Sequence, residues 1–176
     1  MFGNTAKGAL FLTLFILAGC TPGTVRFVQM ADPQMGMFSD NVNMDYETRH
    51  LIIAVDVINS MRPDFVIVSG DLTNKTGDSI QVVTFRRLIS QISSSIPVYL
   101  VPGNHDVGNV PSGASLDLYH CLYGKDYYRF KKGPLYGIVL NSSLMREDSM
   151  ANDEAARQDQ WLCKTILQPR FFIKPA

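Results

Sequence analysis

Three short apolar runs that each end in a tight, polar turn constrain the fold of this chain more than any other feature. The runs and the turns that follow them are 25–30 before 31–34, 65–68 before 69–71, and 96–101 before 102–106. Stretches with helical spacing separate the runs, at about 46–60 and 79–93. This alternation of strands and helices predicts a parallel α/β sheet.

The polar side chains of these turns are predicted to lie close together. In a parallel α/β sheet the carboxyl ends of the strands meet at one edge, which would gather Asp32, Gln34, Asp71, Asn104 and His105. Hard oxygen donors of this kind suit Mn, Mg or Fe. A carboxylate between two ions about 3.5–4 Å apart can bridge them, and such a pair can hold a phosphate and activate water. The sequence therefore predicts a site for two divalent metal ions.

Each turn also has a simpler explanation when it is taken alone. Asp-Pro commonly starts a turn, Gly-Asp commonly follows a strand, and Asn-His-Asp can cap a helix. The occurrence of all three in order, each directly after a strand-like run, favours the metal site. Gly70 and Gly103 fit the same interpretation, because glycine lets the backbone turn sharply and approach a site closely.

With these motifs in place, the chain resembles the N-terminal half of a calcineurin-like metallophosphoesterase. The family has an Asp-x-His turn, a Gly-Asp turn, a Gly-Asn-His-Asp/Glu turn, a lone His and a Gly-His-x-His turn. Five segments resemble more closely a subgroup that contains a vertebrate Ser/Thr phosphatase: 31–34, 103–109, 123–128, 140–142 and 158–162. The resemblance runs from about residue 25 to 167. It implies an αββα sandwich of which only the N-terminal part is present here.

The resemblance also implies roles for the polar residues. Asp32 and Gln34 would bind the first metal ion, Asp71 would bridge both ions, and Asn104 would bind the second. The ions would be Mn, Fe, Mg or Zn. His105 would protonate the leaving oxygen or stabilise charge on the phosphoryl group.

Two residues are expected to support this set of ligands. Asn74 stands where many members of the family carry an acid that orients the catalytic histidine. Asp106 is expected to shape the loop or to support the ligands from behind, and we include both residues in the predicted catalytic group.

Two departures from the family pattern stand out. Gln34 replaces the usual histidine, which exchanges an imidazole nitrogen for an amide oxygen, as the subgroup also does. The lone His and the Gly-His-x-His pair have no counterpart in this sequence. His50 and His120 lie in stretches with helical character and are predicted to be structural.

The remainder of the chain is predicted to complete a truncated domain over 25–176. The segments 126–130 and 135–140 predict a hairpin or a two-strand step. A helix is expected over 152–167, with Trp161 as a core anchor, and 171–173 resembles the beginning of a strand. Such a domain is expected to expose a sheet edge and an apolar face.

The first 20 residues are predicted to be a signal peptide. Lys7 precedes a twelve-residue apolar run, 8–19, which is too short for a membrane span of about 20 residues. Small residues before Cys20 resemble the bacterial lipobox, so Cys20 would carry the lipid and 21–24 would be a short tether. An ordinary secretory signal with an incidental cysteine is the alternative. The predicted location is outside the cytoplasm: either secreted or, with a lipid on Cys20, anchored to a membrane of the bacterial cell envelope.

Composition excludes little, but it gives no support to nucleic-acid binding. The chain has 16 basic and 16 acidic side chains, so it lacks the excess of positive charge that binds phosphate backbones. Cys121 and Cys163 are expected to be small buried hydrophobic residues without a disulfide bond.

The leading functional hypothesis is a metal-dependent phosphoesterase that acts on a phosphorylated protein or small molecule. One alternative is a truncated remnant that binds metal or phosphate weakly and has no turnover. Another is a lipid-anchored binding module. The presence of the polar residues at all three turns counts against that last hypothesis, because a binding module would not need them.

Overall fold

The computed structural model describes residues 23–167. The predicted signal peptide, Cys20, the first half of the tether and the predicted strand 171–173 lie outside the described residues. Among the helices of the described part, none is both long enough and apolar enough to cross a membrane.

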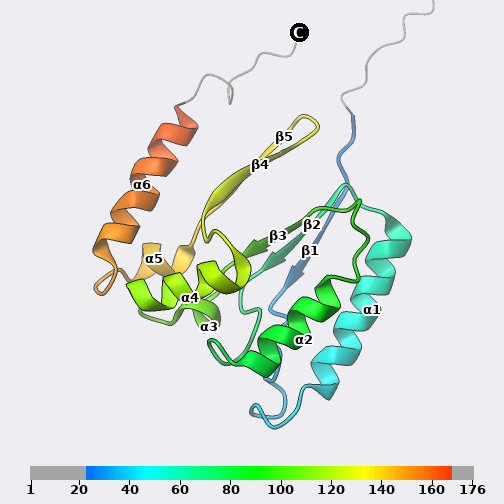
Figure 1. The fold of residues 1–176 in the computed structure, drawn as a ribbon. Coiled ribbons are helices and arrows are strands. Elements are labelled where there is room, and N and C mark those ends of the chain that lie inside the picture. The colour runs from blue at the N-terminus through cyan, green and yellow to red at the C-terminus, as the bar shows by residue number, and fades with distance from the viewer. Residues whose placement is uncertain (1–22, 168–176) are drawn as a thin grey trace, which may run out of the picture.

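A three-stranded parallel sheet forms the centre of the fold. It consists of β1 (Phe27–Ala31), β2 (Phe65–Ser69) and β3 (Val98–Val101), in the order β1-β2-β3. The crossovers contain α1 (Asp45–Met61) and α2 (Ser79–Ile89). The predicted parallel α/β sheet is therefore confirmed, and its strands end at the same edge (Figure 1).

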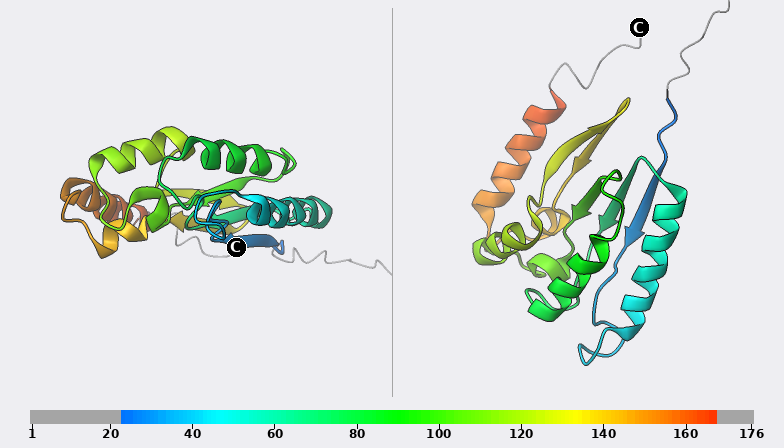
Figure 2. Two further views of the ribbon diagram at one scale, coloured as in Figure 1. Left: turned by 90° about the horizontal axis from the view of Figure 1, so that it is seen from below. Right: turned by 45° about the vertical axis from the view of Figure 1, so that its right-hand side comes forward.

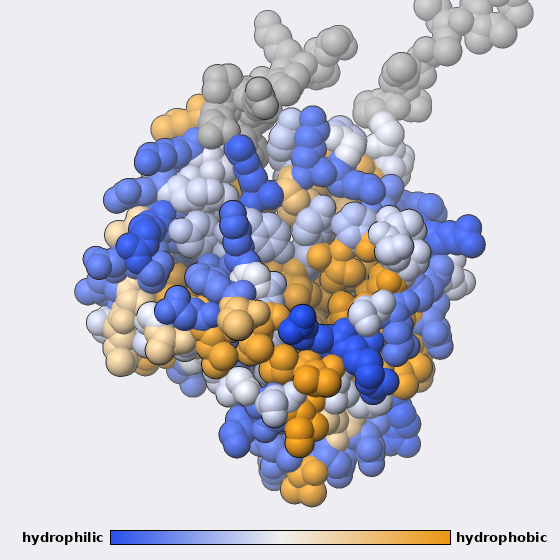
Figure 3. All heavy atoms as spheres, viewed as in Figure 1, coloured by the Kyte–Doolittle hydropathy of each residue, from blue (hydrophilic) through white to orange (hydrophobic). Residues whose placement is uncertain are grey.

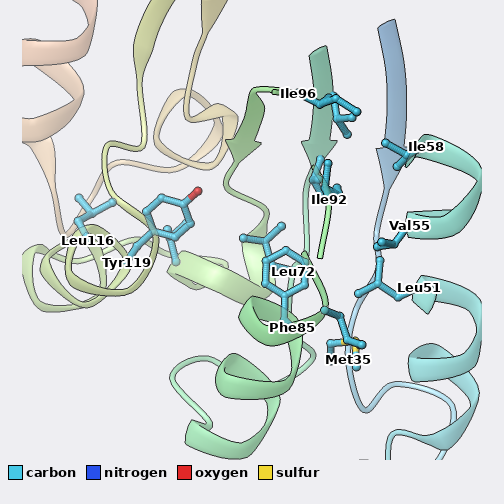
Figure 4. Packing of buried hydrophobic residues seen from close by; sticks show 14 of the residues in the cluster. Met35, Leu51, Val55, Ile58, Leu72, Phe85, Ile92, Ile96, Leu116 and Tyr119 are labelled. Carbon is cyan, nitrogen blue, oxygen red and sulfur yellow. The ribbon is translucent and has the colours of Figure 1, made fainter. Parts of the chain in front are cut away.

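Both crossover helices pack on one face of this sheet. Their apolar side chains meet those of the strands in one buried cluster, seen from close by in Figure 4. The helical and strand members of that cluster include Leu51, Val55, Ile58, Phe85, Leu88, Val66 and Val68. Helices on the same side are the result expected from right-handed crossovers between parallel strands.

The opposite face of the sheet is covered in part by a hairpin. The hairpin pairs β4 (Tyr128–Lys132) with β5 (Leu135–Val139) in antiparallel register, as predicted. The ring of Phe130 stacks on Tyr99 with centroids 3.8 Å apart and meets Phe65 at 5.3 Å. Figures 1 and 2 show the hairpin beyond β3, on the side away from α1.

Four further helices follow β3 or the hairpin: α3 (Asn104–Val107), α4 (Gly113–Tyr123), α5 (Ser142–Arg146) and α6 (Asn152–Ile166). The sequence predicted α6 and helical character around His120 in α4, but it gave α4 no helical start and left α5 irregular. Side-chain caps explain the difference. Ser112 accepts a hydrogen bond from the N–H of Ser115 at 3.2 Å, and Asn141 accepts from that of Ser143 at 3.1 Å.

Helix α2 is shorter than its periodicity predicts. The expected helix continued to residue 93, but α2 ends at Ile89. The side chain of Asn59 in α1 binds the main chain of Gln91 and Ser93 at 2.9 and 2.8 Å. This tertiary contact holds the segment in turns, so the helix does not extend through it.

Three predictions about single side chains were wrong. Trp161 does not anchor the core; it is half-buried and its ring meets that of Tyr127 at 5.1 Å beside a surface cavity. Cys121 and Cys163 are exposed rather than buried, because they lie on the solvent-facing sides of α4 and α6. Both thiols are free, in agreement with the expectation that they form no disulfide bond.

Apolar side chains reach the surface in several places. In the view of Figure 3, hydrophobic residues gather across the middle of the face, and hydrophilic ones surround them. Elsewhere on the described chain, β1 lies at an edge of the parallel sheet, and Phe27 on this strand is 49% exposed. The expected open edge and apolar surface are therefore present in the described part of the chain.

Candidate active site

The three predicted turns converge at the carboxyl edge of the parallel sheet. The N–H of Gln34 donates to the carbonyl of Asp71 at 2.8 Å, which ties the first turn to the second. The N–H of Gly70 donates to the carbonyl of Val101 at 3.0 Å, which ties the second to the third. Parallel strands with adjacent ends thus bring the predicted ligands to one place, beside the start of α3 (Figure 1).

Backbone strain is concentrated at these residues. Six described residues other than glycine have positive φ, and three of them are predicted ligands: Asp32 (50°), Gln34 (35°) and Asp71 (28°). Such a conformation costs about 1–3 kcal/mol at each position, and it persists only where the surroundings hold it. Strained residues of this kind are typical of functional sites, where the strain sets the direction of a side chain.

Helix α3 begins in close contact with Asp71. The N–H of His105, in the first turn of this helix, donates to Oδ1 of Asp71 at 2.9 Å. A Cβ at Gly103 would lie 2.1 Å from the nitrogen of Asp71 and 2.2 Å from its Oδ1. Only glycine allows this approach, as the sequence predicted for position 103.

The imidazole of His105 is oriented by a main-chain group. Its Nδ1 lies 2.6 Å from the carbonyl oxygen of Asn74. Because a carbonyl only accepts, Nδ1 carries the hydrogen, and Nε2 is the ring nitrogen left to exchange a proton with another group. The carbonyl of His105 in turn accepts from the hydroxyl of Thr76 at 2.6 Å, which steadies the turn.

The expected contact from the side chain of Asn74 to His105 is therefore corrected. Asn74 orients the histidine, but it does so through its carbonyl oxygen. Its side-chain amide is engaged elsewhere, with Gln34 at 3.2 Å and Asn41 at 2.9 Å. The main-chain carbonyl of Asn74 already binds the ring, so its side-chain amide can bind Gln34 and Asn41 instead.

Asp106 is buried behind the turns and binds their main chain. It is only 4% exposed, and its carboxylate accepts from the N–H groups of Leu72, Thr73 and Gly103 at 2.9–3.3 Å. Burial raises the pKa of Asp106 to about 6 although these three hydrogen bonds lower it, and the nearby Asp71 raises it further. The buried side chain therefore joins the second turn to the third through their main chains.

The two predicted amide ligands each retain a free oxygen. Nδ2 of Asn104 donates to Asn109 at 3.1 Å, and Nε2 of Gln34 donates to Asn74 at 3.2 Å. Among the described residues, no hydrogen bond engages Oδ1 of Asn104 or Oε1 of Gln34. Both amides thus keep the atom that a metal ion would need.

The donor set fits hard divalent ions. It combines the carboxylates of Asp32 and Asp71 with the two amide oxygens, all of the donor type that Mg²⁺ and Mn²⁺ prefer. Within residues 23–167, no group of three or more His, Cys, Asp or Glu side chains is arranged to hold a metal ion. The set therefore depends on its amides, and it carries less negative charge than a site built from carboxylates alone.

The other two histidines make only local contacts. Nδ1 of His50 lies 2.8 Å from the carbonyl of Tyr46 within α1, and Nε2 of His120 lies 2.7 Å from Oδ1 of the buried Asp126. Neither contact involves a residue of the three turns, in line with the structural roles that the sequence predicts.

A groove opens directly beside Asp32. Its volume is about 310 Å³, and it is lined mainly by apolar side chains of β1, α1 and the loop between them, with Phe38 and Tyr46 among them. Glu47 also lines it; this residue is 5% exposed and its Oε2 has no hydrogen-bond partner among the described residues. A larger cavity of about 690 Å³ lies next to Trp161 and includes no residue of the three turns.

Sequence reasoning missed two residues of the site. Asn41 and Gln81 extend the contacts of Asn74 away from Gln34, at 2.9 Å between Asn74 and Asn41 and 2.8 Å between Asn41 and Gln81. They lie about 40 residues apart in the sequence, and no motif connects them. Only the three-dimensional arrangement reveals that they belong together.

Comparison with known proteins finds relatives that are named as phosphatases. The serine/threonine-protein phosphatase CPPED1 of Bos taurus is 32% identical over 155 residues, which cover 80% of this chain and 50% of that protein. The corresponding protein of Homo sapiens is 30% identical over 156 residues, with 80% and 49% covered. This chain therefore spans about half the length of these curated relatives.

A solved structure and a family model extend the comparison. Purple acid phosphatase PPD1 from seeds of yellow lupin (Lupinus luteus) superposes with a TM-score of 0.53 at 17% identity, covering 74% of this chain and 26% of that one. At this identity the similarity concerns the fold alone. The family model described as calcineurin-like phosphoesterase matches residues 25–164. The chain thus belongs to the calcineurin-like phosphoesterase family.

Proposed function

We propose that this protein is a metal-dependent phosphoesterase that hydrolyses a phosphate ester with water. The observation that carries the proposal is the convergence of two carboxylates, two amide oxygens and an oriented histidine at the carboxyl edge of the sheet. Members of the family use dinuclear metal centres. When bound, two divalent ions would supply Lewis-acid stabilisation of the phosphate and a lowered pKa for the attacking water.

The protein's own residues would hold the ions and fix the positions of the ligands. Asp32 and Gln34 would hold one ion, Asn104 the other, and Asp71 both. The N–H of His105 binds the carboxylate of Asp71, which ties this ligand to the main chain of α3. The strained backbone of the first two turns directs these side chains before any ion arrives.

His105 would manage the proton on the leaving group. The carbonyl of Asn74 holds Nδ1, which leaves Nε2 to donate a proton to the departing oxygen when the ring is an imidazolium. The neutral ring, with its hydrogen on Nδ1, has no proton to donate from Nε2. Asp106 would act only through the main chain of the turns.

The substrate is proposed to be a phosphorylated protein or small molecule. The relatives named as Ser/Thr phosphatases support a phosphomonoester. The apolar groove beside Asp32, at about 310 Å³, offers space for an uncharged part of such a substrate.

The test uses the full chain with p-nitrophenyl phosphate and Mn²⁺. Manganese-dependent release of p-nitrophenol that disappears in Asp71→Ala supports the proposal, with Cys163→Ala, a change at an exposed residue of α6, as the control that keeps full activity. Equal release by wild-type protein and Asp71→Ala refutes a role for this site in the hydrolysis.

Metal binding without turnover is the second candidate function. The small number of charged donors favours it, because the described residues include no group of three or more His, Cys, Asp or Glu side chains arranged to hold a metal ion. Calorimetric titration with Mn²⁺ separates the two: heat of binding abolished by Asp71→Ala, together with no release of p-nitrophenol, supports binding alone.

We further propose that Cys20 carries a lipid and holds the protein at the cell envelope. The support is the sequence alone, a short apolar run that ends in small residues before the cysteine. Metabolic labelling with a fatty-acid analogue in a bacterial host is expected to mark the wild-type protein and to spare Cys20→Ala. Labelling of both proteins, or of neither, would rule the anchor out.

A further inference from the structure

Four side-chain amides form a continuous chain that starts at the predicted metal ligand Gln34. Nε2 of Gln34 donates to Oδ1 of Asn74 at 3.2 Å, and Nδ2 of Asn74 donates to Oδ1 of Asn41 at 2.9 Å. Nε2 of Gln81 donates to the same oxygen of Asn41 at 2.8 Å. The amides come from the loop after β1, the loop after β2, and the first turn of α2.

The far end of this chain is fixed by a group that can act only as a donor. The main-chain N–H of Lys75 donates to Oε1 of Gln81 at 2.9 Å. A main-chain N–H cannot accept, so the oxygen of the Gln81 amide must face Lys75 and its NH₂ group must face Asn41.

The direction of each further amide follows from this anchor. Asn41 meets the NH₂ group of Gln81 and therefore presents its oxygen. Asn74, facing that oxygen, must use its own NH₂ group there, which turns its oxygen toward Gln34. Gln34 consequently donates through Nε2, and Oε1 is the atom left over for the metal side.

Reversal of this chain would disable the ligand. An amide can rotate by a half-turn without changing its shape, and the space at Gln34 alone does not distinguish oxygen from nitrogen. A reversed Gln34 would present an NH₂ group to a cation, and this group has no acceptor function. The direction of the amides therefore decides whether position 34 can bind a metal ion.

The packing around Gln81 supports a fixed anchor. Gln81 is only 3% exposed, and its main-chain N–H is held by the helix cap Asp78 at 3.1 Å. A Cβ at Gly36, where φ is 99°, would lie 2.6 Å from Nε2 of Gln81 and 3.2 Å from Oδ1 of Asn41. Glycine at position 36 thus makes room for the contact between the two amides.

We propose that Gln81 and Asn41 are positioning residues that fix the polarity of Gln34, so that its carbonyl oxygen faces the predicted first metal ion. The inference rests on the proposed function, because it concerns how one ligand is presented. It also explains how a neutral amide can take the place of histidine: its direction is set from about 40 residues away in the sequence. A histidine ligand at this position would instead be oriented by a group hydrogen-bonded to its other ring nitrogen.

Two substitutions that add the same charge distinguish an effect of the direction of the amides from a general effect of charge on cation binding. Gln81→Glu keeps the acceptor for Lys75 but places a second acceptor against Asn41, which favours reversal of the chain. Asn41→Asp supplies an oxygen that accepts from both neighbours and preserves the observed direction. Both substitutions add one carboxylate to the same network, so an unspecific effect of charge on cation binding would have the same sign in both.

The first measurement uses the full chain without metal, by ¹⁵N NMR at pH 8. The side-chain NH₂ group of Gln34 is expected to exchange slowly with water in the wild type and in Asn41→Asp, and quickly in Gln81→Glu. Gln81→Met, which removes the anchor without adding a charge, is expected to behave like Gln81→Glu and covers the case in which that variant does not fold. Slow exchange in every folded Gln81 variant overturns the inference.

The second measurement is calorimetric titration of the same proteins with Mn²⁺. Affinity is expected to fall about 10- to 100-fold in Gln81→Glu, the usual effect of removing support behind a ligand, and to stay within about threefold of wild type in Asn41→Asp. Equal affinities in both variants overturn the inference. Absence of Mn²⁺ binding in the wild type, with the NMR pattern as expected, refutes the proposed metal centre and leaves the polarity of Gln34 supported.

Discussion

The contact between Gly103 and Asp71 predicts a large effect from the addition of one methyl group. In Gly103→Ala the new Cβ would lie 2.1 Å from the nitrogen of Asp71 and 2.2 Å from its Oδ1. Neither atom belongs to a flexible chain end, because the nitrogen is main chain and the carboxylate is held by the N–H of His105 at 2.9 Å. The start of α3 must therefore move away from the second turn by roughly 1 Å.

The cost has two parts. Forcing an extra methyl group into a packed site costs about 1–3 kcal/mol. The shift also lengthens the hydrogen bond from His105 to the carboxylate, and a bond to a charged group contributes about 1.5–3 kcal/mol. We expect the free energy of unfolding to fall by about 3–5 kcal/mol, since the two effects share one displacement and do not add completely.

Gly113→Ala provides a matched control. Gly113 opens α4, and a Cβ there would meet nothing within 4 Å. The same chemical change is expected to be neutral or to stabilise by up to about 1 kcal/mol, because alanine favours the helix and restricts the unfolded chain. Urea unfolding followed by circular dichroism measures both variants under identical conditions.

Comparable stability of the two variants would refute the close approach of α3 to Asp71. A strongly destabilised Gly103→Ala with unchanged affinity for Mn²⁺ would contradict a different step, namely that this approach positions Asp71 as a ligand. The two measurements thus separate the packing of the turns from their proposed use.

Three further predictions concern the buried and the reacting groups. Burial raises the pKa of Asp106 from 3.8 to about 6, so the stability that the protonated side chain contributes is present below pH 4 and is lost as the pH rises through 6. The free energy of unfolding in urea should therefore fall by about 2 kcal/mol between pH 4 and 7 in the wild type and not in Asp106→Asn; the same pH profile in both proteins would contradict this. His105→Ala should lower turnover of p-nitrophenyl phosphate at least 100-fold with Mn²⁺ affinity within about threefold of wild type, whereas wild-type turnover in this variant would eliminate His105 as the proton donor. Gln158→Leu should cost about 2–4 kcal/mol, because buried Gln158 binds both main-chain groups of Asn141 at 2.8 and 3.2 Å; a loss below 1 kcal/mol in urea would show that these bonds matter little.

The sequence predicted those features that depend on local pattern. The strands β1, β2 and β3, the helix α1 and the hairpin follow from apolar periodicity and turn residues, and their positions agree within a few residues. Convergence of the three turns was predictable as well, because parallel strands must end at one edge. These predictions need no knowledge of which side chains touch.

Features that depend on contacts between distant segments were not predictable. The early end of α2 results from Asn59, a residue of another helix. The side chain of Asn74 was expected at the histidine, yet only the folded turn shows that the carbonyl already occupies that place. Exposure of Cys121 and Cys163 depends on how α4 and α6 are rotated against the segments they pack on, which the helices' own sequences do not show.

The site combines rigid construction with a low charge, and the two properties are connected. Two close carboxylates in a metal-free site repel each other, and additional acids would raise that cost. Amide ligands at positions 34 and 104 avoid the repulsion, but a neutral amide binds a cation only if its oxygen faces the ion. The strained turns and the chain of amides ending at Lys75 meet this condition in the absence of metal. Replacing Gln34 by His would remove the need for Asn41 and Gln81, so in Gln34→His the Mn²⁺ affinity should become insensitive to Gln81→Glu; a remaining 10-fold effect would show that these residues act on the site by another route.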